Sequence, residues 1–243
     1  MNPHDEGHSG SNFLKQRTNT RICLTFYRNR APMAISEPIN KVNLERITNG
    51  IFAFTMTLLA RDIVTADQYA KASLITIEQF SLNTIGSIID FVGIFILLAM
   101  FWMLFFQMFH RMKTFDHHFL HVHMLALMAI VVIPFSSAFS NLSEGYTFTD
   151  FFFQINYLLL GLLLVYLWHY ARSKPALLDP ALTDADALFL YHKCLVPPAV
   201  ALFAIILLLI NSRYTDFLMD LMYFVPFVML AIFFRRPPFE PAV

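Results

Sequence analysis

The 243-residue sequence has little charge, little glycine and little cysteine, and each shortage excludes a class of protein. Charged residues make up only 14% and sum to a formal net charge of zero, so nothing indicates a nucleic-acid partner. Seven glycines form no loop that would cradle a phosphate. Two isolated cysteines, Cys23 and Cys194, make neither a disulfide framework nor a metal site. Serines near 136–140 have no evident His or Asp partners, so we expect no enzyme and no cofactor.

Apolar residues are abundant instead. They make up 57% of the chain, and 27 phenylalanines raise the aromatic share to 16%. A soluble domain is usually about 45–50% apolar. The excess predicts an all-α polytopic membrane protein in a lipid bilayer. The first forty residues are polar and lack an early apolar segment, which is not typical of a cleaved signal peptide.

Six segments are candidate membrane helices, since a spanning helix needs about 20 mostly apolar residues. Five meet this easily: Ile85–Phe109, Leu120–Phe139, Phe148–Tyr170, Leu188–Ile210 and Tyr214–Phe234. The sixth, TNGIFAFTMTLLARD at Thr48–Asp62, has only eleven residues between its polar ends. We expect a mobile tail at 1–42, a six-helix domain at 43–236 and a short tail at 237–243.

Basic residues predict the orientation of these helices. Thirteen of the seventeen Lys and Arg residues fall before the first helix, between the second and third, after the fourth or after the sixth. The alternate connections hold only Arg61, Lys71 and Arg213. The positive-inside rule then places both termini in the cytoplasm, and it supports counting 48–62 as a span.

The segment 48–62 is unusually polar for a membrane helix. On helical spacing, one stripe contains Asn49/Gly50, Ala53/Phe54, Thr57/Leu58 and Arg61. A stripe with polar ends and an apolar middle suits the lining of a narrow pore with a hydrophobic constriction. The alternative is a helix packed in the core of a bundle.

Several segments resemble the transmembrane protein 175-type potassium channels. GIFAFTMTLL is similar to the first-helix signature of that family, and FWMLFFQMFHRMKTFDHHFL to the end of its second helix and the following loop. HMLALMAIVVIPFSSAFS and NYLLLGLLLVYLWHYAR resemble its third and fourth helices. The resemblance covers about residues 43–236.

The resemblance implies a potassium-permeable homotetramer whose first helices line the pore. Phe54, Leu58 and Arg61 would lie on the pore-lining stripe, with Thr57 beside them, and K⁺ would be the permeant ion. The sequence lacks the Thr-Val-Gly-Tyr-Gly loop that forms a carbonyl filter in other potassium channels. A single six-helix unit implies a prokaryotic cell membrane, the alternative being an endosomal or lysosomal membrane.

The sequence departs from the family pattern around the first helix. The family's Phe-Ser-Asp triplet is Ile47-Thr48-Asn49 here, its helix-two histidines are Phe105-Phe106, and its helix-three asparagine is His123. We therefore expect a rearranged polar network around the first helix, composed of Thr48, Asn49, Trp102 and His123.

Two alternatives to a channel stay open. Arg61 replaces an aliphatic pore residue of the family, and four such arginines would repel cations, which favours a non-conducting scaffold or regulatory subunit. Five histidines crowd residues 110–123, and His117 and His121 have the i, i+4 spacing of metal ligands, the pattern of an intramembrane metal enzyme. Interfacial histidines without metal are the simpler interpretation.

Overall fold

A computed structural model of the chain describes residues 41–60, 77–141, 147–210 and 215–233, and these ranges are helical apart from their connections. The helices are α2 (Lys41–Leu59), α4 (Ile77–His110), α5 (His117–Asn141), α6 (Thr147–Ser173), the 3₁₀ helix η2 (Pro175–Leu177), α7 (Asp184–Ile210) and α8 (Thr215–Phe233). Within these ranges no strand forms. The predicted all-α fold is confirmed.

Four of the described helices are long and apolar enough to cross a membrane. The candidate spans are Ile88–His110, His117–Ala138, Phe151–Ser173 and Asp184–Ile210. The apolar part of α8, Tyr223–Ile232, is shorter, and α2 is not among the candidates. A multi-pass membrane protein is therefore what the composition of the helices supports.

Two helices begin about two turns earlier than the sequence pattern predicts. The first starts at Lys41 instead of Thr48, and Leu44 continues its buried face by one turn. The second starts at Ile77 instead of Ile85. Helix α2 therefore has 19 residues, although its apolar part is as short as the sequence indicates.

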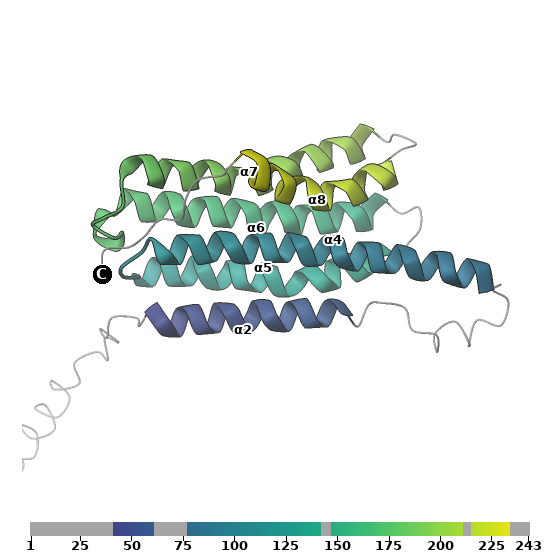
Figure 1. The fold of residues 1–243 in the computed structure, drawn as a ribbon, viewed down its shortest axis with the longest axis horizontal. Helices are drawn as coiled ribbons and strands as arrows, with labels where there is room; N and C mark the ends of the chain where they lie inside the picture. The colour runs from purple at the N-terminus through teal and green to yellow at the C-terminus, as the bar shows by residue number, and fades with distance from the viewer. Residues whose placement is uncertain (1–40, 61–76, 142–146, 211–214, 234–243) are drawn as a thin grey trace, which may run out of the picture. The chain divides into compact units, whose positions relative to one another are not determined.

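The helices lie side by side in an order that leaves α2 at one edge. Figure 1 shows α2 beside α4 and α5, with α7 and α8 along the opposite edge. Helix α6 packs against both α5 and α7. The largest fully buried side chains include Trp168, Tyr157 and Phe101, and Trp168 Nε1 donates to the Ala187 carbonyl at 2.9 Å.

The α6–α7 contact is close because glycine faces proline. A Cβ placed on Gly161 would lie 2.9 Å from both Cδ and N of Pro198. Pro197 and Pro198 lie inside α7. The missing side chain of Gly161 therefore lets the two backbones approach each other.

At one end of the bundle, two connections are joined to each other. Lys113 N–H donates to the Leu177 carbonyl at 2.8 Å, and Asp179 N–H donates to the Arg111 carbonyl at 3.0 Å. Asp116 caps α5 by accepting from Phe119 N–H at 2.9 Å. This end is held by backbone hydrogen bonds rather than by helix packing alone.

Asp116 also links α5 to the end of α6. It accepts from Tyr170 at 2.5 Å and from Lys174 at 2.8 Å. Partial burial by itself would raise the pKa of Asp116, but the hydrogen bonds from Lys174, Tyr170 and Phe119 outweigh it and lower the pKa to about 2. The same contacts raise the pKa of Lys174 to about 12.

Candidate functional site

Helix α2 buries one face and exposes the other. Its buried residues are Leu44, Thr48, Phe52, Thr55 and Leu59, which recur at helical spacing. This face packs against α4 and α5. The helix is therefore packed on one side, rather than enclosed by the bundle.

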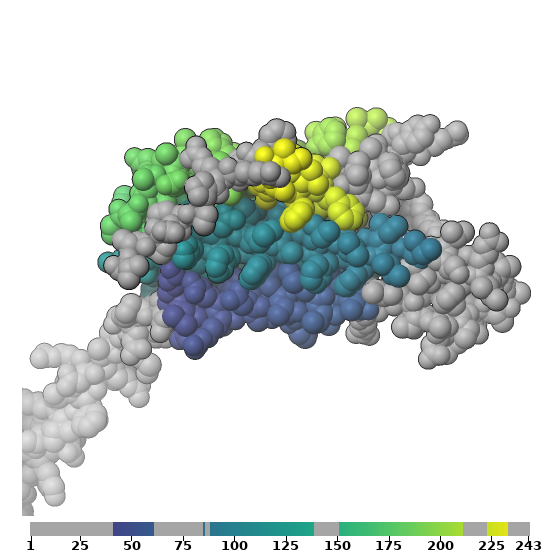
Figure 2. All heavy atoms as spheres, in the orientation of Figure 1, coloured from purple at the N-terminus to yellow at the C-terminus, as the bar shows by residue number. Residues whose placement is uncertain are grey.

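The exposed face of α2 carries most of the predicted stripe. Gly50, Ala53, Phe54 and Thr57 are exposed, Phe54 with 58% of its surface, whereas Leu58 is half-buried. No heavy atom lies within 4 Å of a Cβ placed on Gly50. Figure 2 shows α2 as a band along the edge that the other described helices leave uncovered. Arg61 lies outside the described residues.

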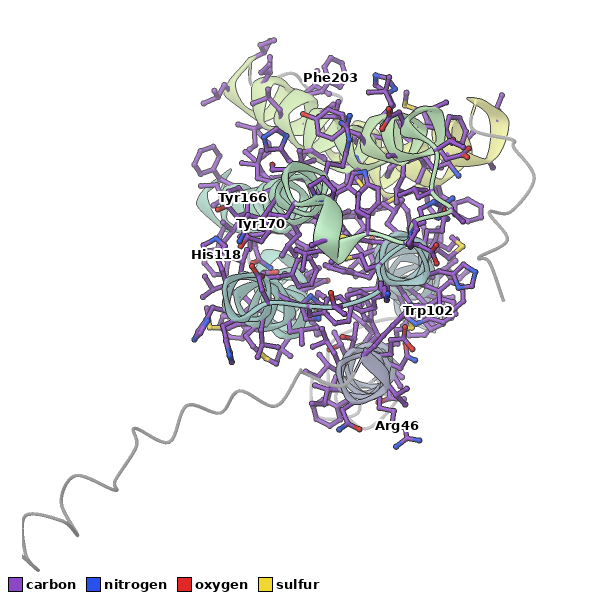
Figure 3. All side chains as sticks on the ribbon, turned by 90° about the vertical axis from the view of Figure 1, so that its left-hand side faces the viewer. Arg46, Trp102, His118, Tyr166, Tyr170 and Phe203 are labelled. Carbon is purple, nitrogen blue, oxygen red and sulfur yellow. The ribbon has the colours of Figure 1, made fainter. Side chains whose placement is uncertain are left out.

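This exposed face mixes small, polar and aromatic residues. Thr57 satisfies its hydroxyl donor within α2, by donating to the Phe54 carbonyl at 2.7 Å. Arg46 is exposed too, and Figure 3 shows its side chain pointing away from the bundle. A face with arginine, threonine and glycine is poorly suited to lipid tails, since polar groups in hydrocarbon face protein or water.

Two hydrogen bonds attach the buried and flanking sides of α2 to different helices. Thr48 Oγ1 and His123 Nε2 of α5 are 2.8 Å apart, and both side chains are buried. Trp102 Nε1 of α4 donates to Asn49 Oδ1 at 2.9 Å. The four residues expected to surround the first helix therefore form two separate pairs, one to each neighbouring helix.

The direction of the Thr48–His123 bond follows from counting hydrogens. The Thr48 hydroxyl has one hydrogen, which it donates to the Leu44 carbonyl at 2.8 Å. We assign His123 Nε2 as the donor to Thr48, because the other tautomer would bury an unpaired N–H at Nδ1. His123 Nδ1 is buried and has no hydrogen-bond partner among the described residues.

Aromatic rings surround His123. The ring centroids of Phe105 and Phe109 each lie 5.2 Å from that of His123, both edge-on, and Phe119 stacks at 6.2 Å. Phe105 also contacts Phe52 of α2 at 6.0 Å. Phe105 and Phe106, which the resemblance aligns with two family histidines, point to different surroundings. Phe105 faces His123, whereas Phe106 is exposed and stacks on His110.

A small groove opens between α2 and α4. It has a volume of about 280 Å³ including its open side, and its walls are polar on α2 and aromatic on α4. The lining residues are Glu45, Thr48, Asn49, Trp102, Phe105, Phe106 and Phe109. Sequence reasoning missed Glu45 because it placed the helix start after it. Its position four residues before Asn49 is the signal that would have located it.

The crowded histidines do not converge in the described part of the chain. There, no group of three or more His, Cys, Asp or Glu side chains is placed to hold a metal ion. His121 Nδ1 instead contacts the His117 carbonyl, and His118 Nε2 lies 2.9 Å from the Tyr166 hydroxyl. His118, Tyr166 and Tyr170 cluster on one side of the bundle in Figure 3.

Comparisons with known proteins agree with the arrangement of helices. Residues 43–134 match the family model described as "Endosomal/lysosomal potassium channel TMEM175". The fold is similar to the crystal structure of a lysosomal potassium-selective channel TMEM175 homolog from Chamaesiphon minutus, with a TM-score of 0.64 and 17% identity. That similarity covers 77% of this chain and 96% of the other. A comparison with curated proteins finds no match.

The matched family segment contains nearly all of α2, all of α4 and most of α5. These helices carry the two hydrogen-bonded pairs and the groove. Both names describe ion channels rather than enzymes, as the sequence predicts. The family model over residues 43–134 and the shared fold both support the resemblance to TMEM175-type channels that the sequence indicates.

Proposed function

We propose that the protein is a potassium channel, formed by four copies of the chain whose α2 helices surround a central pore. The observation that carries this proposal is the exposed face of α2. The small and polar residues Gly50, Ala53 and Thr57 lie along this face, yet no described helix covers it. A central pore would give this face water and protein instead of lipid.

Phe54 is the best candidate for the narrowest point of the pore. Phe54 is 58% exposed and lies about one helical turn before Thr57 on the exposed stripe. Leu58, which is half-buried, would support it from the flank. Four aromatic rings around an axis make a hydrophobic constriction, which limits ion passage through dehydration and size.

Arg61 is expected near the opposite end of the pore from Lys41. A ring of four arginines there would oppose cation entry, and this keeps a non-conducting scaffold as the second candidate. The adjacent Asp62 offsets part of that charge. Potassium flux decides between the two.

The test is ion flux into liposomes that contain purified protein, with potassium, sodium and chloride compared. We expect potassium flux above the sodium and chloride controls. Phe54→Ala should increase flux and reduce the preference for potassium, because it removes the constriction. The matched control is Phe203→Ala, since Phe203 is similarly exposed at 52% but lies across the bundle from α2 (Figure 3).

Phe203→Ala should leave flux unchanged. Equal effects of the two substitutions would contradict the pore assignment. A chain that is folded and assembled but carries no flux would support the scaffold. Chloride flux in place of potassium flux would show that the positive charge of Arg61 dominates the electrostatic potential in the pore.

A further inference from the structure

We propose that Arg46 of one copy inserts into the α2–α4 groove of the next copy and pairs there with Glu45. This inference rests on the proposed assembly around α2 and specifies its contact. It would give each subunit boundary one buried ion pair.

The groove offers what a guanidinium binds. Glu45 supplies a carboxylate, and Asn49 Oδ1, which accepts from Trp102 at 2.9 Å, has a second lone pair. Trp102 and Phe106 supply aromatic surface, with their rings 5.9 Å apart. The open side of the groove leaves room for the end of one side chain.

Arg46 is a cation in need of a partner. Its side chain is exposed and forms no ion pair with any described residue. Glu45 is the neighbouring residue, but adjacent side chains on a helix point about 100° apart. Among the described residues of its own copy, Glu45 makes one ion pair, a long contact of 3.9 Å to Lys41.

Symmetry brings the two groups to the same level. A rotation axis parallel to α2 leaves every residue at its own height in the next copy. With a rise of about 1.5 Å per residue, Arg46 lies between Glu45 and Asn49 in height. An Arg46 that reaches sideways from the next copy therefore meets the groove without any shift along the axis.

The pairing also removes an electrostatic obstacle. Arg46 is on the exposed face near the end of α2, so four unpaired copies would place four positive charges at one mouth of the pore. Such a ring repels cations and the subunits that carry it. When Arg46 of each copy pairs with Glu45 of the next, positive and negative charges alternate around the pore mouth and neutralise each other.

The experiment uses the full chain in lipid nanodiscs with Cys23→Ser as background, since Cys194 is buried. First, Gly50→Cys is oxidised, and covalent dimers show that α2 helices face each other. Then Arg46→Glu and Glu45→Arg are each compared with the combined swap, by mass photometry across protein concentrations. The matched control is Lys113→Glu, a charge reversal of an exposed lysine at the same end of the bundle.

We expect either single reversal to raise the concentration for half-dissociation roughly tenfold or more, because like charges then face each other. The combined swap should restore it to near the wild-type value, while Lys113→Glu should leave it unchanged. The swap also removes any explanation through lost folding of a single variant.

Two outcomes overturn the inference in different ways. If Gly50→Cys forms covalent dimers but Arg46→Glu behaves like Lys113→Glu, the groove has another occupant and the assembly around α2 stands. If Gly50→Cys forms none in assembled protein, α2 does not face its copies, and the proposed pore arrangement falls together with the contact.

Discussion

The hydrogen bond between Thr48 and His123 gives the sharpest prediction about the fold, because its two ends are not equivalent. His123 donates to Thr48, whereas Thr48 keeps its own hydrogen for the Leu44 carbonyl. Thr48→Val leaves a buried ring N–H without an acceptor. His123→Phe leaves the Thr48 hydroxyl still bonded to Leu44. The valine substitution should therefore cost more than the loss of an ordinary hydrogen bond.

A buried donor left unpaired costs about 1–3 kcal/mol, and we expect Thr48→Val to lower the free energy of unfolding by that amount. His123→Phe adds volume among Phe105, Phe109 and Phe119, which has its own cost. Thr48→Val combined with His123→Phe should be more stable than the sum of the single effects predicts. Cross-helix hydrogen bonds in membrane proteins give coupling energies of about 0.6 kcal/mol, up to about 1.7.

Reversible unfolding in bicelles measures all four proteins of the cycle, and the extra volume of phenylalanine cancels in it. Thr57→Val is the matched control, because the Thr57 hydroxyl is exposed and bonds only within its own helix. It should change the unfolding free energy by a few tenths of a kcal/mol at most. If Thr48→Val were as harmless as Thr57→Val, the assigned direction of the bond would be wrong. A coupling energy of zero would show that the bond contributes no stability.

Two further predictions concern packing and charge. Gly161→Ala should destabilise the bundle by about 1–3 kcal/mol in the same assay, because the new methyl would lie 2.9 Å from Pro198. As the control, Gly50→Ala meets no atom within 4 Å and should leave subunit stability unchanged or higher. Equal effects of the two substitutions would show that the α6–α7 contact adapts to the methyl group. Asp116 has a folded pKa of about 2, below its unfolded value near 3.9, so its contribution to stability is present above about pH 4 and is lost as the pH falls toward 2. The difference in melting temperature between wild type and Asp116→Asn should accordingly be constant above pH 4 and shrink below it, and a difference that stays constant down to pH 2 would mean that the link to Lys174 contributes nothing.

Helical spacing grouped four residues on one side of α2 that the structure leaves exposed, although Leu58 of the same stripe is half-buried. The stripe through Gly50, Ala53, Phe54 and Thr57 follows from a period of 3.6 residues, and the buried side follows as its complement. The start of the helix was not predictable by the same rule. Lys41–Ile47 looks polar, and only contacts with α4 and α5 show that Leu44 extends the buried face.

The polar pairs could not be derived from local pattern either. Thr48 and His123 are 75 residues apart, and Asn49 and Trp102 are 53 apart. No periodicity connects positions on different helices. Only the family resemblance grouped these four residues, and it did not indicate which residue binds which. The pairing needed the packing of three helices.

These two pairs determine how α2 is rotated, and this connects the fold to the proposed pore. Thr48 and Asn49 are adjacent, so their side chains diverge by about 100°, and each is bound to a different helix. With one hydrogen bond alone, α2 could still rotate about that contact. Two bonds in diverging directions fix the rotation of the helix about its own axis. The exposed arc is then set, and Phe54 lies within it. Neither Thr48 nor Asn49 lies at the centre of that arc. A substitution at either residue should nevertheless alter conduction, because loss of its hydrogen bond would let Phe54 turn away from the proposed pore axis.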